Sequence, residues 1–155
     1  MKKLIVLFAF SLTVLGGFAQ ESELDPKFAS YMIETERRTV FVQNMNLNEA
    51  DAKIFWPIFD AFEAELLTLR ETGIINLKTY GEQYEKMTDE QASTLMNSML
   101  KNEALRSKVR KKYYKKFSKE LGGKVATRVM QLDSIVAMVL RLSIYDELPL
   151  VGDMN

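Results

Sequence analysis

The stretch EKMTDEQAST, residues 85–94, marks a point where one helical segment stops and the next one starts. Thr88 is a good N-cap, because its hydroxyl oxygen can accept a hydrogen bond from an unpaired backbone N–H of the first turn. Gln91 follows three residues later, where its side chain can reach back to the Thr88 N–H. Asp89 and Glu90 place negative charge at the positive end of the helix dipole. The stretch therefore predicts a capping box at Thr88 and a helix that starts there.

A weaker version of the same device occurs about forty residues earlier, in the stretch MNLNEADAKIF. Asn48 is the candidate N-cap, and Asp51 stands where Gln91 stands in the later stretch. The residue before each cap is apolar, Leu47 in the first stretch and Met87 in the second, as a hydrophobic staple requires. Both stretches therefore predict helix starts.

Helical patterns account for almost everything after the first residues. Asp25-Pro26 is typical of an N-cap followed by proline at the first helical position, and it predicts a helix over residues 26–43. The helix that starts at Asn48 carries apolar residues at alternating spacings of four and three, which predicts a seam against another helix. Pro57 inside this pattern predicts a bend near the first turns. The seam comprises Phe55, Phe59, Phe62, Leu66 and Leu69, then Leu77, Tyr80, Tyr84 and Met87.

The helix that starts at Thr88 is predicted to end at Gly122-Gly123, because glycine commonly closes a helix C-terminus. A last helix, residues 124–142, is apolar on most sides. The sequence therefore predicts an all-α fold of four helices that includes an antiparallel hairpin of two long helices. One neighbour cannot cover all apolar positions of the last helix, which favours a twofold homodimer. Those positions include Met130, Ile135, Met138 and Leu140.

The chain start has the pattern of a cleavable secretory signal peptide. Met1-Lys2-Lys3 is basic, Leu4–Leu15 is apolar but for a serine and a threonine, and Gly17-Phe18-Ala19 offers small residues for cleavage. The apolar run is too short for a membrane span. We expect a signal peptide over residues 1–19, one helical domain over residues 20–148 and a disordered tail over residues 149–155.

Residue types argue against an enzyme and against a metal or cofactor site. The chain contains no histidine and no cysteine, so it lacks an imidazole base, a thiolate nucleophile and soft metal ligands. No glycine-rich phosphate loop is present, and no loop has the acidic spacing of a calcium site. We expect no catalytic residues, no metal and no cofactor, which leaves binding functions.

The order of these features resembles the Spy/CpxP family of periplasmic proteins. That family carries two N-cap motifs of the form Leu-Thr-x-x-Gln, the LTxxQ motif. Here Asn48 and Asp51 replace Thr and Gln in the first motif, and Met87 replaces Leu in the second. The stretch LNEADAKIFWPIFDAFEAEL also resembles divergent Bacteroidetes-type members, which often carry Phe-Trp-Pro at this place. The similarity covers roughly residues 30–142.

The resemblance implies a periplasmic, ATP-independent chaperone of envelope stress that forms cradle-shaped antiparallel dimers around unfolding proteins. Other family members are implied to act as regulators that bind a signalling partner. Three hypotheses follow: a holdase chaperone, a regulatory protein that binds a sensor kinase or an anti-sigma partner, and a structural module with one fixed partner.

The charges are distributed unevenly, although the chain as a whole is neutral. Residues 101–128 carry eleven basic and two acidic side chains, whereas residues 20–100 carry seven basic and fifteen acidic ones. At 100° per residue the lysines gather on one helical face. This face is either a solvated surface that pairs partly with Glu63, Glu65 and Glu71, or a positive surface that steers acidic client segments. The candidate client-binding lysines are Lys108, Lys111, Lys112 and Lys115.

Methionines are the second candidate for client binding, because their flexible thioethers suit promiscuous surfaces. The alternative is that they fill the core as ordinary apolar residues. The candidates are Met96, Met99, Met130 and Met138. Nucleic acid is a poor partner for a secreted chain. A membrane surface is also disfavoured, because the apolar face opposite the lysines is needed for the core.

Overall fold

The computed structural model describes residues 26–145 and 150–151, with side chains over residues 33–142 and 150–151. It contains α2 (Pro26–Met45), α3 (Glu49–Gln83), a short 3-10 turn η1 (Tyr84–Lys86), α4 (Asp89–Leu121) and α5 (Gly123–Tyr145). The described part of the chain has no strand, so the predicted all-α fold of four helices is confirmed. The predicted signal peptide, and all of the predicted tail except residues 150–151, lie outside the described residues.

Both predicted caps are present. The Gln91 N–H donates to Thr88 Oγ1 at 3.2 Å, and the Thr88 N–H donates to Gln91 Oε1 at 2.9 Å, which completes the capping box. At the start of α3, the Asp51 N–H donates to Asn48 Oδ1 at 2.8 Å. The chain therefore stops and restarts its helices where the polar side chains replace the missing backbone partners.

α2 starts at Pro26 as predicted, whereas the end of α2 and both ends of α5 lie one to three residues from the predicted bounds. α2 continues to Met45, and the chain leaves it through Asn46, whose φ of 49° lies in the left-handed region that asparagine tolerates. α4 ends at Leu121 and is followed by the C-cap Gly122, whose φ of 84° and ψ of 160° belong to a conformation almost restricted to glycine. α5 begins at the very next residue, so one glycine makes the whole turn.

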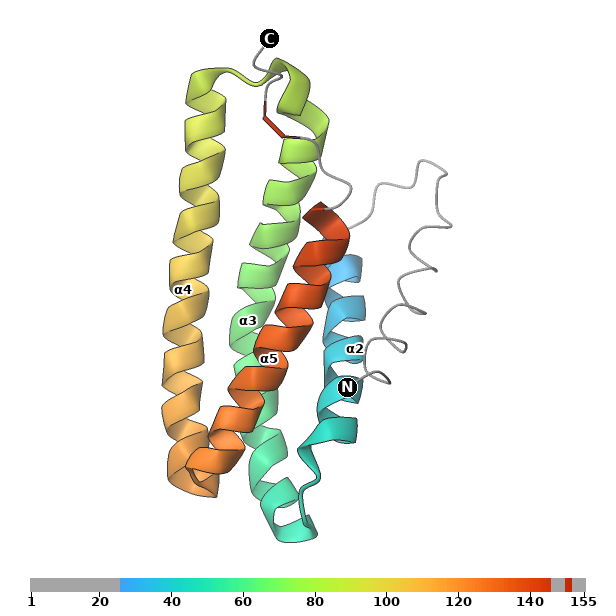
Figure 1. Cartoon of the computed structure of the whole chain (residues 1–155), viewed down its shortest axis with the longest axis vertical. Helices are drawn as coiled ribbons and strands as arrows, with labels where there is room; N and C mark the ends of the chain where they lie inside the picture. The colour runs from blue at the N-terminus through green and yellow to red at the C-terminus, as the bar shows by residue number, and fades with distance from the viewer. Residues whose placement is uncertain (1–25, 146–149, 152–155) are drawn as a thin grey trace.

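The two long helices, α3 and α4, form an antiparallel hairpin, as predicted (Figure 1). α2 and α5 lie along only part of its length, so one end of the hairpin extends beyond them (Figure 1). α3 packs against α2 and α4, and α5 packs against the same two helices. No described helix combines the length and the apolar character that a membrane crossing requires.

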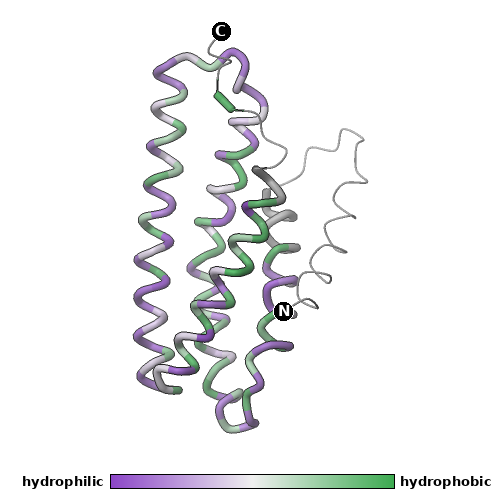
Figure 2. Tube along the Cα trace, viewed as in Figure 1, coloured by the Kyte–Doolittle hydropathy of each residue, from purple (hydrophilic) through white to green (hydrophobic). Residues whose placement is uncertain are grey.

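An aromatic core fills the end of the bundle near the α2–α3 and α4–α5 turns. The rings of Phe41 and Phe59 lie 4.6 Å apart between centroids, and those of Phe55 and Phe117 lie 5.4 Å apart. All four side chains are buried, so the first part of the predicted seam is confirmed. Figure 2 shows hydrophobic residues recurring along a largely hydrophilic α4, whereas α5 is more hydrophobic. α4 therefore offers one narrow face to the core and the rest to solvent.

Candidate functional site

Three charged side chains from three helices meet in the interior. Arg37 of α2 donates from Nη2 to Glu63 Oε1 of α3 and to Asp133 Oδ1 of α5, both at 2.8 Å. The three residues are at most 2 % exposed. Buried charges persist only when they are paired and hydrogen-bonded, and here one guanidinium bridges two carboxylates.

Further arginines surround this triad. Arg70 contacts Glu63 at 2.6 Å, and Arg106 contacts Asp133 at 3.4 Å. Arg110 Nε lies 2.8 Å from Asp133 Oδ2, but the two atoms are not aligned for a hydrogen bond, so this contact is coulombic. At the edge, Arg141 pairs with Glu103 at 2.7 Å. Together these residues hold five guanidinium groups and three carboxylates, and we call them the arginine cluster. Its members are Arg37, Arg70, Arg106, Arg110, Arg141, Glu63, Glu103 and Asp133.

The ionisation of the cluster follows from its contacts. Burial opposes the charged form of Asp133, but the attraction of Arg37 and Arg106 outweighs it and holds the pKa of Asp133 below its usual value. Burial also opposes the charge of Arg37, yet Glu63 and Asp133 together raise its pKa. Burial lowers the pKa of Arg106 more than Asp133 restores it. Arg106 is therefore less well compensated by its surroundings than Arg37.

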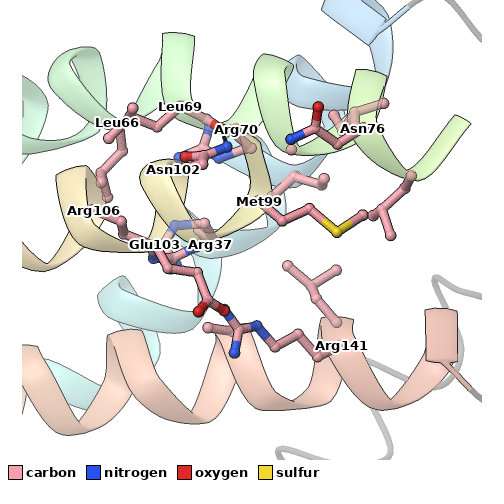
Figure 3. Close-up of a pocket in the computed structure, with 16 residues that line it drawn as sticks. Arg37, Leu66, Leu69, Arg70, Asn76, Met99, Asn102, Glu103, Arg106 and Arg141 are labelled. Atoms are coloured by element: carbon pink, nitrogen blue, oxygen red, sulfur yellow. Dashed lines mark hydrogen bonds and ion pairs between the residues drawn. The ribbon is translucent and has the colours of Figure 1, made fainter. Parts of the chain in front are cut away.

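A pocket of about 190 Å³ lies beside the cluster and takes side chains from all four helices (Figure 3). Its walls are largely apolar, and Arg37, Arg70, Arg106 and Arg141 also line it. The apolar lining consists of Ile33, Leu66, Leu69, Ile74, Leu77, Met99, Ala137 and Leu140. Apolar walls with a few polar groups are typical of a small-molecule site.

Two asparagines of the pocket differ in how their amides are satisfied. Asn102 Nδ2 donates to the Leu69 carbonyl at 2.8 Å and ties α4 to α3. Asn76 Oδ1 accepts from Ser98 Oγ at 3.1 Å. The other end of that amide, Asn76 Nδ2, is buried and has no hydrogen-bond partner among the described residues.

A second, more open hollow of about 480 Å³ lies between α4 and α5. Arg106, Arg110 and Asp133 line it, together with Met138 and Leu142. We call this hollow the α4–α5 groove. Met138 and Leu142 are 56 % and 66 % exposed, so the groove has an apolar rim on its α5 side.

The predicted client-binding lysines lie on the outer face of α4, and all four are exposed. Lys112 pairs with Glu65, which also accepts a 2.8 Å hydrogen bond from the Tyr113 hydroxyl. Both bonds lower the pKa of Glu65, and the bond from Lys112 has the larger effect. Among the described residues, Lys108, Lys111 and Lys115 form no ion pair. The face is therefore mostly unpaired.

The four candidate methionines occupy different surroundings. Met96 and Met138 are more than half exposed, on α4 and α5 respectively. Met99 is half-buried in the pocket wall, and Met130 is half-buried against the core. The structure therefore does not bring the lysines and methionines together into one patch. The residues of the two capping motifs lie at the starts of α3 and α4. They are Leu47, Asn48 and Asp51 at α3, and Met87, Thr88 and Gln91 at α4.

One expectation about the lysines needs correction. Glu63 is not a surface partner for them, because it is buried and pairs with Arg37 and Arg70. Sequence reasoning overlooked the charged triad, although a signal was present. Glu63 lies four residues after Phe59 and three before Leu66, and Asp133 stands in the same relation to Val129 and Val136. A lone charge within an apolar helical stripe indicates a buried ion pair.

No family model, curated protein or solved structure matches the chain. The resemblance to the Spy/CpxP family therefore stays a prediction, carried by the cap motifs and the helix order. Among the described residues, no three acidic side chains gather closely enough to hold a metal ion.

Proposed function

We propose that this protein is a periplasmic, ATP-independent holdase that binds unfolding polypeptides through the α4–α5 groove and the basic face of α4. The observation that carries the proposal is the exposed apolar rim of that groove. Met138 and Leu142 form that rim, and Ile135, three residues before Met138, continues the same exposed apolar row on α5. Exposed apolar side chains in one row mark an interaction surface.

α4 contributes the opposite side of the same surface. Leu100 precedes Glu103 by three residues and Ser107 by seven, so it shares the face of α4 that lines the groove. Leu100 and Met96, four residues earlier, are 54 % and 53 % exposed. Apolar side chains therefore flank the groove from both helices, which is the arrangement that an extended apolar segment needs.

The basic face of α4 gives the surface a second property. The unpaired lysines create a positive potential on the outer face of α4, around the helix from the residues that line the groove. Such a field raises the rate at which acidic segments arrive, and apolar contacts then hold them. The combination favours many clients over one, because neither steering nor flexible methionine contacts demand a fixed sequence.

A homodimer is part of the proposal, in which Ile135 of the α5 row contacts a second copy of the chain while Met138 and Leu142 stay available to clients. A twofold pairing of this kind would shape a larger concave surface. Sedimentation at micromolar concentration measures the assembly directly. A monomer would leave the whole α5 row to clients.

A second candidate function is regulation, in which the same surface binds one signalling partner. The buried charges favour regulation, because ion pairs that join three helices hold them in one arrangement. A surface with one fixed shape suits a single dedicated partner. Suppression of aggregation separates the two candidates. A holdase at near-stoichiometric amounts keeps several unrelated denatured proteins from scattering light, whereas a dedicated regulator protects none of them.

A further inference from the structure

The pocket beside the arginine cluster adjoins the α4–α5 groove and shares Glu103, Arg106, Ala137 and Arg141 with it, but its other walls come from α2 and α3 as well as α4 and α5. It lies among all four helices and combines apolar walls with guanidinium groups (Figure 3). A cavity of about 150 Å³ with apolar walls can hold benzene. The volume of about 190 Å³ therefore admits an apolar group of ring size or a short acyl chain.

The charge around the pocket favours an anion. Among the described residues that line it, four are arginines and one, Glu103, is acidic. The contact between Arg106 and Asp133, at 3.4 Å, is the longest of its ion pairs, and Asp133 Oδ1 already accepts from Arg37 at 2.8 Å. Arg106 therefore retains capacity to donate to another carboxylate, and it lines the pocket.

A buried donor supplies the second observation. Asn76 is only 7 % exposed, it lines the pocket, and its Nδ2 has no partner among the described residues. Figure 3 shows Asn76 on α3 and Arg141 on α5, on opposite sides of the pocket. A buried N–H without an acceptor costs free energy, which a ligand oxygen would recover.

We propose that this pocket binds a small apolar monocarboxylate, whose hydrocarbon part packs between Leu69, Leu77 and Met99. The cationic side of the pocket, with Arg106, receives the carboxylate. Asn76 Nδ2 lies near the other end of the pocket, beside Ser98, and donates to a hydroxyl or keto oxygen at the far end of the hydrocarbon part. The ligand class is that of short- to medium-chain fatty acids, plain or oxygenated at the far end. Met138 and Leu142, the exposed rim of the α4–α5 groove, do not line the pocket, so substitutions at the rim test client binding separately from ligand binding.

The glycines of α3 provide a matched test of the pocket. A Cβ on Gly73 would lie 3.6 Å from Asn102 Nδ2, an ordinary contact, and would narrow the pocket. A Cβ on Gly81 of the same helix would meet nothing within 4 Å. Alanine favours helix more than glycine at both positions, so both variants should remain folded. Gly73→Ala should weaken ligand binding, and Gly81→Ala should not.

Isothermal titration of the full chain with octanoate, octanol and acetate separates the contributions of the carboxylate and the hydrocarbon chain to binding. Octanol lacks the carboxylate, and acetate lacks the long hydrocarbon chain. Octanoate should bind at least about tenfold more tightly than either control. Octanoate should also shift the side-chain amide signal of Asn76 in a ¹⁵N–¹H spectrum. Arg106→Gln should weaken octanoate about tenfold, whereas Arg128→Gln, an exposed arginine outside the cluster, should leave it unchanged.

Three results would overturn the proposal. Octanol that binds as tightly as octanoate would show that the arginines do not recognise the carboxylate. Equal binding by the Gly73 and Gly81 variants would place the ligand elsewhere. A peptide with a free apolar C-terminus that binds at the pocket while octanoate does not would assign the site to a polypeptide end.

Discussion

Arg37 of α2 and Asp133 of α5 stand 96 positions apart in the chain, and their side chains share a 2.8 Å hydrogen bond in the interior. Both side chains are at most 2 % exposed. The bond links the first described helix to the last, and Glu63 adds α3 to the same network. The charges therefore join three helices at one point of the interior.

Removal of one member of this network should be costly. Asp133→Ala leaves Arg37 with a single carboxylate in the interior, and loss of one partner from a buried pair typically costs about 3–5 kcal/mol. Urea unfolding measures the change. Glu103→Ala is the matched control, because it removes the exposed pair with Arg141 and should cost only about 0–1 kcal/mol. Similar losses in the two variants would contradict a special role for the buried network.

The same residue predicts a pH dependence. Arg37 and Arg106 outweigh burial and hold the pKa of Asp133 in the folded protein below its usual value, which is about 3.9 in an unfolded chain. A carboxylate with a depressed folded pKa contributes stability above the unfolded pKa and loses it as the pH falls through the folded pKa. The stability difference between wild type and Asp133→Asn should therefore be constant near neutral pH and shrink below about pH 4. Urea unfolding from pH 7 to pH 3 tests this, and a difference that grows on acidification would refute it.

Helix starts were predictable because their signals are local. The cap at Thr88 involves Gln91, and the cap at Asn48 involves Asp51. Each pair satisfies backbone groups within one turn, so residues close in the sequence determine each helix start. The triad was not predicted, because Arg37, Glu63 and Asp133 lie on three helices whose relative arrangement no single stretch encodes. The pocket was missed for the same reason, since its walls come from four helices. Exposure of the lysines followed from periodicity alone, whereas the partner of Lys112 required the packing of α4 on α3.

The capping box should contribute measurably to stability. Thr88→Ala removes the hydroxyl that accepts from the Gln91 N–H, and loss of an N-cap costs about 1 kcal/mol. Thr94 provides the control, because it is exposed inside α4, where alanine is a better helix former. Thermal unfolding should thus show a lower melting temperature for Thr88→Ala than for the wild type. Thr94→Ala should not lower the melting temperature. An unchanged Thr88 variant would mean that the hairpin turn does not depend on its cap.

The unpaired lysines should affect the rate of client capture more than stability. The triple variant Lys108→Gln, Lys111→Gln, Lys115→Gln spares Lys112 and its pair with Glu65. The matched control replaces Lys53, Lys78 and Lys86 by glutamine. It also removes three positive charges, but from residues outside α4. Stopped-flow capture of an acidic unfolded client should slow in the first variant, and the wild-type rate should fall as salt rises. Equal rates in both variants at low and high salt would remove the basic face from the mechanism.

Titration of a labelled, permanently unfolded polypeptide tests client binding by the α4–α5 groove most directly. Met138→Ser with Leu142→Ser removes the apolar rim on α5, and Val42→Ser with Ile54→Ser removes two exposed apolar side chains elsewhere. Fluorescence anisotropy should show binding by the wild type, at least about tenfold weaker binding by the rim variant, and no change in the control. No binding by the wild type, or equal weakening in both variants, would contradict the proposal that the groove holds unfolded clients.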